Sequence, residues 1–229
     1  MAACCNLFLD QHDVSTACLY GVLPKDQRVY LHPPHGVDLP DDRVLVCLRG
    51  IYGLKQSPRL FNQHLSRAIA VLNYIQSKLV WFKHDWRDFV IVAIIVDDML
   101  HAATSRRLLY DFSEHLSSIY KMTHLGVPKL MIGIKISFSD SHIALSQQHY
   151  IEQLSRKYGQ CSSAPVHTPG NFSGCLPGPD RTESEPLDTA SKPYLSLVGS
   201  LLWVCVTRPD VQTAVRLACA HSASPTLAH

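Results

Sequence analysis

The sequence predicts an α+β fold in which antiparallel strands are backed by helices, and three observations carry this prediction. Eight apolar residues at 89–96 run directly into Asp97 and Asp98, and a second, largely apolar stretch follows at 99–103, which is typical of a buried hairpin. Amphipathic stripes on both sides of this hairpin predict helices. A stretch rich in proline, serine and glycine between about 162 and 193 then separates a helical C-terminal part.

The elements before the hairpin are short strands followed by one helix. Residues 10–20 are expected to form a strand entering a turn, and 29–31 and 44–46 are short strand candidates separated by prolines. Ser57 is a good N-cap for the helix that follows, and Pro58 suits its first position. The apolar stripe of this helix consists of Phe61, Leu65, Ala68, Ile69 and Leu72.

The elements after the hairpin alternate between helix and strand. A second amphipathic helix is expected to be capped near Thr104 or Ser105. Strands at 129–138 and 142–145 are expected to pair, and Ser146 is expected to cap a third helix. Two further helices are expected beyond the proline-rich segment, at 195–206 and 208–220.

Composition places the chain among globular proteins and argues against zinc-binding, secreted and membrane-spanning proteins. The net charge of +2 is too small to demand a nucleic-acid partner. The eight cysteines show no C-x-x-C spacing, which argues against a zinc site and fits reduced thiols. We interpret most of the 13 dispersed histidines as surface or satisfied core residues. We see no secretory signal and no apolar run long enough for a membrane span, so an intracellular protein is expected.

Asp97 and Asp98 have two interpretations from the residues alone. Adjacent carboxylates held at the exposed end of a buried strand favour a bound divalent cation, and Mg²⁺ is the default for carboxylate and phosphate oxygens. The same pair is also ordinary turn chemistry, because aspartate bonds readily to its own backbone. A P-loop ATPase is disfavoured, because G-x-x-x-x-G-K-[ST] does not occur in the chain.

Ordered motifs run nearly end to end through the chain. The three most specific are QHDVSTACLYG at 11–21, YGLKQSPR at 52–59 and VDDML at 96–100. Through these motifs the chain resembles the reverse transcriptase of copia-type (Ty1/copia) retrotransposons. Weaker matches follow at compatible spacing: LG at 125–126, MIG at 131–133, LSQ at 145–147, YI at 150–151, TP at 168–169, Tyr194 with GSL at 199–201, and TRPD at 207–210.

The resemblance implies two-metal nucleotidyl transfer, with Asp13, Asp97 and Asp98 as the catalytic and metal-binding triad. The implied cofactor is a pair of Mg²⁺ ions, for which Mn²⁺ can substitute. The implied nucleotide-binding residues are Cys18, Tyr52, Gly53, Lys55 and Gln56. The implied primer and template contacts are Met131, Ile132, Gly133, Arg59 and Arg67, with Arg106, Arg107 and Lys121 as further candidates for phosphate contacts; each of these basic residues is equally well explained as a solvated surface charge.

Three departures from the family pattern carry expectations. Ile95 stands where the family has tyrosine, and Cys18 stands where it usually has a phenylalanine that bars a ribose 2′-hydroxyl. The smaller Cys18 is expected to weaken discrimination against ribonucleotides. Only twelve residues precede Asp13, so the fingers of the family are expected to be largely missing, with weak or no polymerase activity by the chain alone.

The resemblance therefore predicts a polymerase palm-like antiparallel sheet backed by helices at 1–160, a linker at 161–193, and a thumb-like or connection-like helical pair at 194–229. The expected function is that of an RNA-directed DNA polymerase domain of a copia-type polyprotein. The alternative is a catalytically inactive retrotransposon-derived remnant or nucleic-acid-binding module. Expected partners are an RNA or DNA template–primer, deoxynucleoside triphosphates and other parts of the polyprotein, with no membrane. The expected location is cytoplasmic, within virus-like particles, or nuclear.

Overall fold

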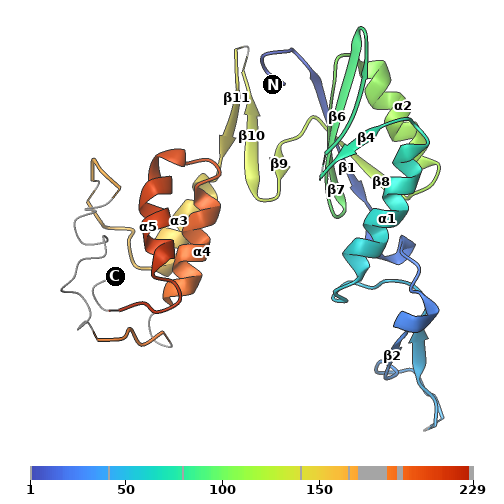
Figure 1. Cartoon of the computed structure of the whole chain (residues 1–229), viewed down its shortest axis with the longest axis horizontal. Coiled ribbons are helices and arrows are strands. Elements are labelled where there is room, and N and C mark those ends of the chain that lie inside the picture. The colour runs from blue at the N-terminus through green and yellow to red at the C-terminus, as the bar shows by residue number, and fades with distance from the viewer. Residues whose placement is uncertain are drawn as a thin grey trace. The chain divides into compact units, whose positions relative to one another are not determined.

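A computed structural model describes residues 2–40, 42–78, 80–139, 141–164, 166–169, 185–189 and 193–226 (Figure 1). The chain divides into two compact units, which we describe separately. The first unit holds residues 1–131 and 140–142, and the second holds 132–139 and 143–229. Among the described residues, no helix is long and apolar enough to cross a membrane.

The first unit is built on a six-stranded sheet whose strand order is β4-β5-β6-β7-β1-β8. The predicted α+β class with a mainly antiparallel sheet is confirmed, since the five neighbouring strand pairs all run antiparallel. Because β1 pairs between β7 and β8, residues far apart in the sequence meet at the centre of the sheet. The strands are β1 (Phe8–Val14), β4 (Ile75–Ser77), β5 (Val80–Asp85), β6 (Asp88–Ile95), β7 (Asp98–Ala103) and β8 (Met122–Gly126).

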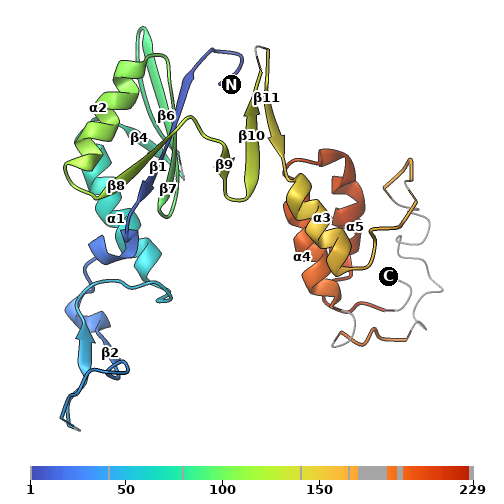
Figure 2. The same ribbon diagram turned by 180° about the vertical axis from the view of Figure 1, so that it is seen from behind.

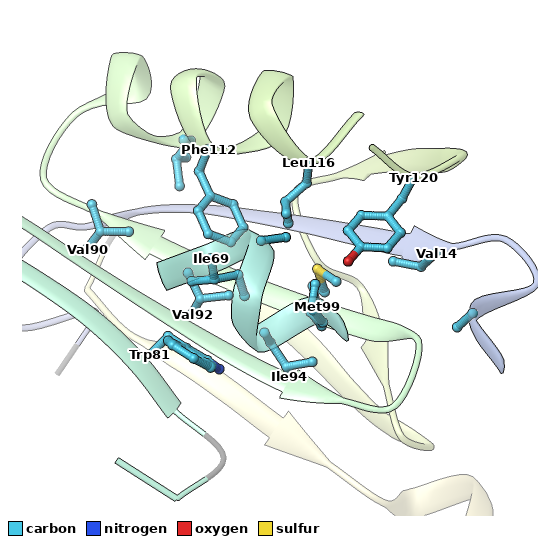
Figure 3. Close-up of a cluster of buried hydrophobic side chains, with 14 of the residues drawn as sticks. Val14, Ile69, Trp81, Val90, Val92, Ile94, Met99, Phe112, Leu116 and Tyr120 are labelled. Carbon is cyan, nitrogen blue, oxygen red and sulfur yellow. The ribbon is translucent and has the colours of Figure 1, made fainter. Parts of the chain in front are cut away.

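Two helices, α1 (Ser57–Ala70) and α2 (Arg106–Ser117), cover one face of this sheet in both views (Figures 1 and 2). Alternate residues of the central strands point toward them, as the two-residue period of a strand requires. Phe112 and Leu116 of α2 pack over Val92 and Met99 of the sheet, as Figure 3 shows. Each fully buried side chain of this size stabilises the fold by roughly 1.5–3 kcal/mol, so this layer holds the helices to the sheet.

Smaller elements depart from the predicted bounds at several points. The strand predicted at 10–20 ends at Val14, because Thr16 adopts a left-handed conformation (φ 56°) and a 3-10 helix follows. Ser57 is the first helical residue of α1 and not its cap, whereas Ser105 caps α2 by accepting a hydrogen bond from the Leu108 N–H. The remaining elements of this unit are η1 (Ala17–Tyr20), η2 (Lys25–Gln27), β2 (Val29–Leu31), β3 (Leu45–Cys47) and β9 (Leu130–Met131).

The second unit contains a hairpin and three α-helices that lie side by side (Figure 2). Gln147 is buried at the start of the first of these helices; its side-chain amide donates to the Trp203 carbonyl at 3.1 Å and accepts from the Thr207 hydroxyl at 2.8 Å. Much of the linker predicted at 161–193 lies outside the described residues, and the domain bounds stay a prediction. The elements are β10 (Ile134–Phe138), β11 (Ile143–Ser146), α3 (Gln148–Lys157), α4 (Tyr194–Val204), η4 (Pro209–Val211) and α5 (Gln212–Ala220).

The β6–β7 turn carries backbone strain. Ile95 pairs with Asp98, so only Val96 and Asp97 form the turn, and Val96 has φ 58°. A positive φ at the first central residue is the geometry of tight hairpin turns, which normally place glycine or asparagine there. A β-branched residue in this region is a genuine outlier, and such strain concentrates at functional sites.

We predict that Val96→Gly will stabilise the first unit by up to about 1 kcal/mol. A side chain in the left-handed region costs roughly 1–2 kcal/mol, and glycine removes this cost. Glycine also makes the unfolded chain more flexible, which lowers the free energy of unfolding by only roughly 0.5–1 kcal/mol. Little burial is lost, because Val96 is 41% exposed. The matched control is Val71→Gly, at an exposed valine with an ordinary φ of −58°, which should be destabilising in urea unfolding. Equal destabilisation by the two substitutions would show that the turn is not strained.

Candidate functional site

The pairing of β1 with β7 brings the three predicted catalytic acids to one end of the sheet. Asp13 lies directly opposite Asp98 in the register, and Asp97 occupies the adjoining turn. The Val14 N–H donates to the Asp97 carbonyl at 3.0 Å, which fixes the turn against the end of β1. The acids are therefore placed by backbone hydrogen bonds, while their side chains stay partly exposed.

The electrostatics of this end of the sheet are those of clustered like charges. Partial burial raises the pKa of Asp13, and the nearby charges of Asp97 and Asp98 raise it further. In the part of the chain that the structure describes, no lysine or arginine forms a salt bridge with any of the three. Such a cluster gains free energy by binding a cation or a proton.

The three carboxylates do not yet form a closed coordination sphere. Within the described ranges, one group of three potential ligands has all its ligand atoms within 4.8 Å of one another, and that group is Asp10, His12 and His124. Asp13, Asp97 and Asp98 do not form such a group. Mutual repulsion opposes the close approach of three carboxylates, and bound cations would offset this repulsion.

Two predicted nucleotide-binding residues join the acids. Cys18 is buried in η1, and burial followed by the charge of Asp97 raises the pKa of its thiol. Burial and then Asp97 likewise raise the pKa of the exposed Tyr52. Close packing holds this segment together, because a Cβ on Gly50 would lie 2.8 Å from the Cys18 carbonyl oxygen and 2.8 Å from Ser57 Oγ. Glycine is therefore required at position 50 for the loop before α1 to pass η1.

Other predicted site residues precede α1 or lie on it. Gly53 has φ 94°, a conformation that favours glycine, and Lys55 is exposed while Gln56 is half-buried. Arg59 and Arg67 are exposed on the polar side of α1.

The predicted primer-contact segment has one link to β1. Gln11, two residues before Asp13 and therefore on the same face of β1, donates from Nε2 to the Leu130 carbonyl at 3.1 Å. Met131 follows and is buried. Ile132 and Gly133, with φ 45° and 77°, belong to the second unit.

The further basic candidates have structural roles of their own. Arg106 lies over the Phe8 ring at 5.2 Å, and Arg107 pairs with Asp111 at 3.8 Å on the surface of α2. Lys121 is exposed. A phosphate-binding role is thus unnecessary to explain Arg106 or Arg107, although both side chains remain near solvent.

One cluster is an exception to the interpretation of most histidines as surface or satisfied core residues. His12 and His101 are buried in the sheet, and His12 Nδ1 and both ring nitrogens of His101 have no hydrogen-bond partner. The alternation of Asp10 and His12 along a strand was a visible signal. The approach of His124 depends on the β1–β8 register, which the sequence does not reveal.

Comparison with known proteins gives a consistent result. Residues 1–171 match the family model described as "Reverse transcriptase (RNA-dependent DNA polymerase)". The chain is 31% identical, over 94% of its length, to the "Retrovirus-related Pol polyprotein from transposon TNT 1-94" of Nicotiana tabacum, of which the match covers 17%. It is 29% identical, over 90% of its length, to a putative transposon Ty5-1 protein of Saccharomyces cerevisiae, of which the match covers 67%.

A third relative is also a Pol polyprotein that is matched over a small part of its length. The chain is 28% identical, over 90% of its length, to the "Retrovirus-related Pol polyprotein from transposon RE1" of Arabidopsis thaliana, of which the match covers 14%. The chain therefore spans less than a fifth of the Pol polyproteins to which it is similar.

We predict that Asp13→Asn will raise the free energy of unfolding at pH 7, because it removes one of three facing negative charges. The pKa of Asp13 is raised in the folded state, so the folded chain holds this proton more tightly than the unfolded chain. The cost of the charge is therefore present at neutral pH and disappears as the pH falls below the ordinary value of 3.8. The advantage of the variant should be lost over the same range in thermal unfolding measured from pH 7 to pH 3.

The control is Asp38→Asn, at an exposed loop acid, which should show no such pH-dependent gain. Mg²⁺ should stabilise the wild type more than Asp13→Asn, because the ion offsets the same repulsion. A variant that is less stable than the wild type at pH 7, or equally stabilised by Mg²⁺, would contradict the electrostatic account.

Proposed function

The chain belongs to the copia-type retrotransposon reverse transcriptase (RNA-dependent DNA polymerase) family, and from this membership we propose that it catalyses RNA-directed DNA synthesis as a domain of a Pol polyprotein. The observation that carries the proposal is the meeting of Asp13 with Asp98 across β1 and β7, beside Asp97 in a strained turn. Acidic side chains gathered at one end of a sheet, with no salt bridge to lysine or arginine in the described residues, suit nucleotidyl transfer.

The first unit supplies the palm in this proposal. Its sheet carries the acids at one end and is backed by α1 and α2, which keep the strands rigid (Figure 1). The helices α4 and α5 are proposed to be thumb-like or connection-like. The proposed domain bounds are those drawn from composition, at 1–160, 161–193 and 194–229.

Asp13, Asp97 and Asp98 would hold two Mg²⁺ ions, which Mn²⁺ can replace. Their carboxylate oxygens are the ligands that hard divalent cations prefer. Two such ions, when bound, would stabilise the negative charge that develops on the primer 3′-oxygen and on the leaving pyrophosphate. The protein itself positions the reacting groups and needs no covalent step, so rigid placement of the three acids is its main contribution.

The incoming nucleotide is proposed to bind beside the acids, over Cys18 and Tyr52. The proposal is supported by the charge of Asp97, which, after burial, raises the pKa of both side chains. Exposed Lys55 would meet triphosphate oxygens, and the positive φ of Gly53 shapes the turn that carries it. Gln56, half-buried just before α1, would also contact the nucleotide.

The template–primer is proposed to contact two regions. The segment Met131, Ile132 and Gly133 would hold the primer, supported by the hydrogen bond from Gln11 that ties the preceding residue to the Asp13 face of β1. Exposed Arg59 and Arg67 would neutralise phosphates. Partners of the proposed enzyme are thus an RNA or DNA template–primer, deoxynucleoside triphosphates, and other parts of a retrotransposon polyprotein.

One observation favours a second candidate function. Within the described residues, the group of three whose ligand atoms converge is Asp10, His12 and His124, and it does not include the three acids. A chain whose acids never close on metal would be a catalytically inactive nucleic-acid-binding module with the same fold. Primer extension distinguishes the two functions.

We predict that extension of a DNA primer on an RNA template with Mg²⁺ by the chain alone will be weak, and that Asp97→Asn will reduce its rate by about 10²–10³-fold. This is the usual cost of removing one group that stabilises charge in the transition state. The matched control is Asp88→Asn. Asp88 begins β6, at the end of that strand away from the Asp97 turn, so its substitution should leave the rate unchanged. Binding of template–primer by the wild type without any extension would establish the inactive module instead.

We predict weak discrimination between deoxyribonucleotides and ribonucleotides, because Cys18 is smaller than the phenylalanine usual in the family. Cys18→Phe should increase the ratio of kcat/KM for deoxyribonucleotides over ribonucleotides by at least about 10-fold. Discrimination by a pocket against one small group, here the ribose 2′-hydroxyl, is typically of this magnitude. Cys18→Ala is the control for removal of the thiol and should keep the wild-type ratio. Full selectivity in the wild type, unchanged by Cys18→Phe, would refute a gating role for position 18.

A further inference from the structure

A second group of potential metal ligands lies on the helix-covered face of the sheet. Asp10 and His12 alternate along β1, so their side chains share one face, whereas Asp13 points to the other. His124 of the edge strand β8 lies directly opposite His12 in the register. The group is therefore separated from the three catalytic candidates by the thickness of the sheet.

The donor atoms of this group already converge. His124 Nε2 lies 2.6 Å from Asp10 Oδ2, and His12 Nε2 lies 3.8 Å from the same oxygen. One donor atom from each of the three residues falls within 4.8 Å of the other two. Ligands of a tetrahedral ion at about 2.0–2.1 Å lie about 3.3 Å apart, so small side-chain rotations would complete the geometry.

The buried His12 imidazole faces the group through Nε2. His12 is 2% exposed, and its Nε2 lies 3.8 Å from Asp10 Oδ2, which is beyond hydrogen-bond distance. A cation between these two atoms would be coordinated by both. The other ring nitrogen, Nδ1, has no hydrogen-bond partner in the described residues, and binding at Nε2 would not change that.

Ring contacts fix the orientation of the histidine side chains. The His12 ring stacks on His101 at 4.8 Å and lies 4.6 Å from the His124 ring. His101 in turn meets the Phe112 ring edge-on at 4.5 Å, which fixes it against α2. Burial lowers the pKa of both His12 and His101, which keeps them neutral as metal ligation requires.

We propose that Asp10 Oδ2, His12 Nε2 and His124 Nε2 bind one divalent transition-metal ion of the Zn²⁺ class. Two imidazoles and one carboxylate suit zinc, whereas Mg²⁺ takes oxygen ligands. The fourth position is open to water, because His124 is 64% exposed at the edge of the sheet. The ion clamps the edge strand β8 to β1, the strand that carries Asp13.

The test measures Zn²⁺ bound to the full chain by equilibrium dialysis in a Mg²⁺-containing buffer. Exposed Cys4, Cys5 and Cys161 offer thiols that can bind Zn²⁺ in every variant, so the measured quantity is the difference between wild type and His124→Ala. We expect wild type to bind one equivalent more at micromolar free Zn²⁺, and Asp10→Asn to weaken the site at least 10-fold. His35→Ala, at an exposed loop histidine, should leave binding unchanged.

Hydrogen exchange gives a second readout that is independent of polymerase activity. Zn²⁺ should slow amide exchange in β8 of the wild type and of His35→Ala, with no such effect in His124→Ala. The proposal would be overturned if wild type and His124→Ala bound the same number of Zn²⁺ ions, or if amide exchange in β8 did not change with Zn²⁺. Asp10 and His124 would then be a hydrogen-bonded pair only. Because His124 is exposed, its substitution should not unfold the chain.

Discussion

The antiparallel pairing of β1 with β7 is the constraint on which the first unit depends. It joins residues 8–13 to residues 98–103, and it sets Asp13 opposite Asp98 while the turn places Asp97 beside them. A slip of one residue in this register would exchange the two faces of β1. Asp13 would then enter the apolar layer under α1 and α2 and leave Asp98, and Val14 would move out of that layer. Burial of Val14 and Met99 therefore fixes the position of the charged cluster on the opposite face.

The same register gives the two faces of β1 different chemistry. One face presents Asp13 and Gln11, whose contacts are with the catalytic end of the sheet and with the segment before Met131. The other presents His12, which stacks on the His101 ring and whose Nδ1 has no hydrogen-bond partner. Hard oxygen ligands and imidazole ligands thus lie on opposite sides of one strand. A single chain can in this way hold two kinds of cation without competition between them.

Much of this arrangement was predictable from the sequence, and the remainder depended on register. The apolar run at 89–96 predicted the hairpin, because a continuous β-branched stretch ending in Asp97 has few other structures. Periodicity also predicted α1 and α2. The left-handed Thr16, which ends β1 early, has no signature in a threonine. The meeting of His12 with His124 across 112 positions of sequence depends on long-range pairing, which local patterns do not encode.

The most direct measurement is the anomalous difference map of crystals of the chain soaked in Mn²⁺. Our account predicts two peaks about 3.5–4 Å apart between the carboxylates of Asp13, Asp97 and Asp98, which move together around the ions. Peaks confined to Asp10, His12 and His124, or no peak within coordination distance of Asp13, would contradict the proposed two-metal site.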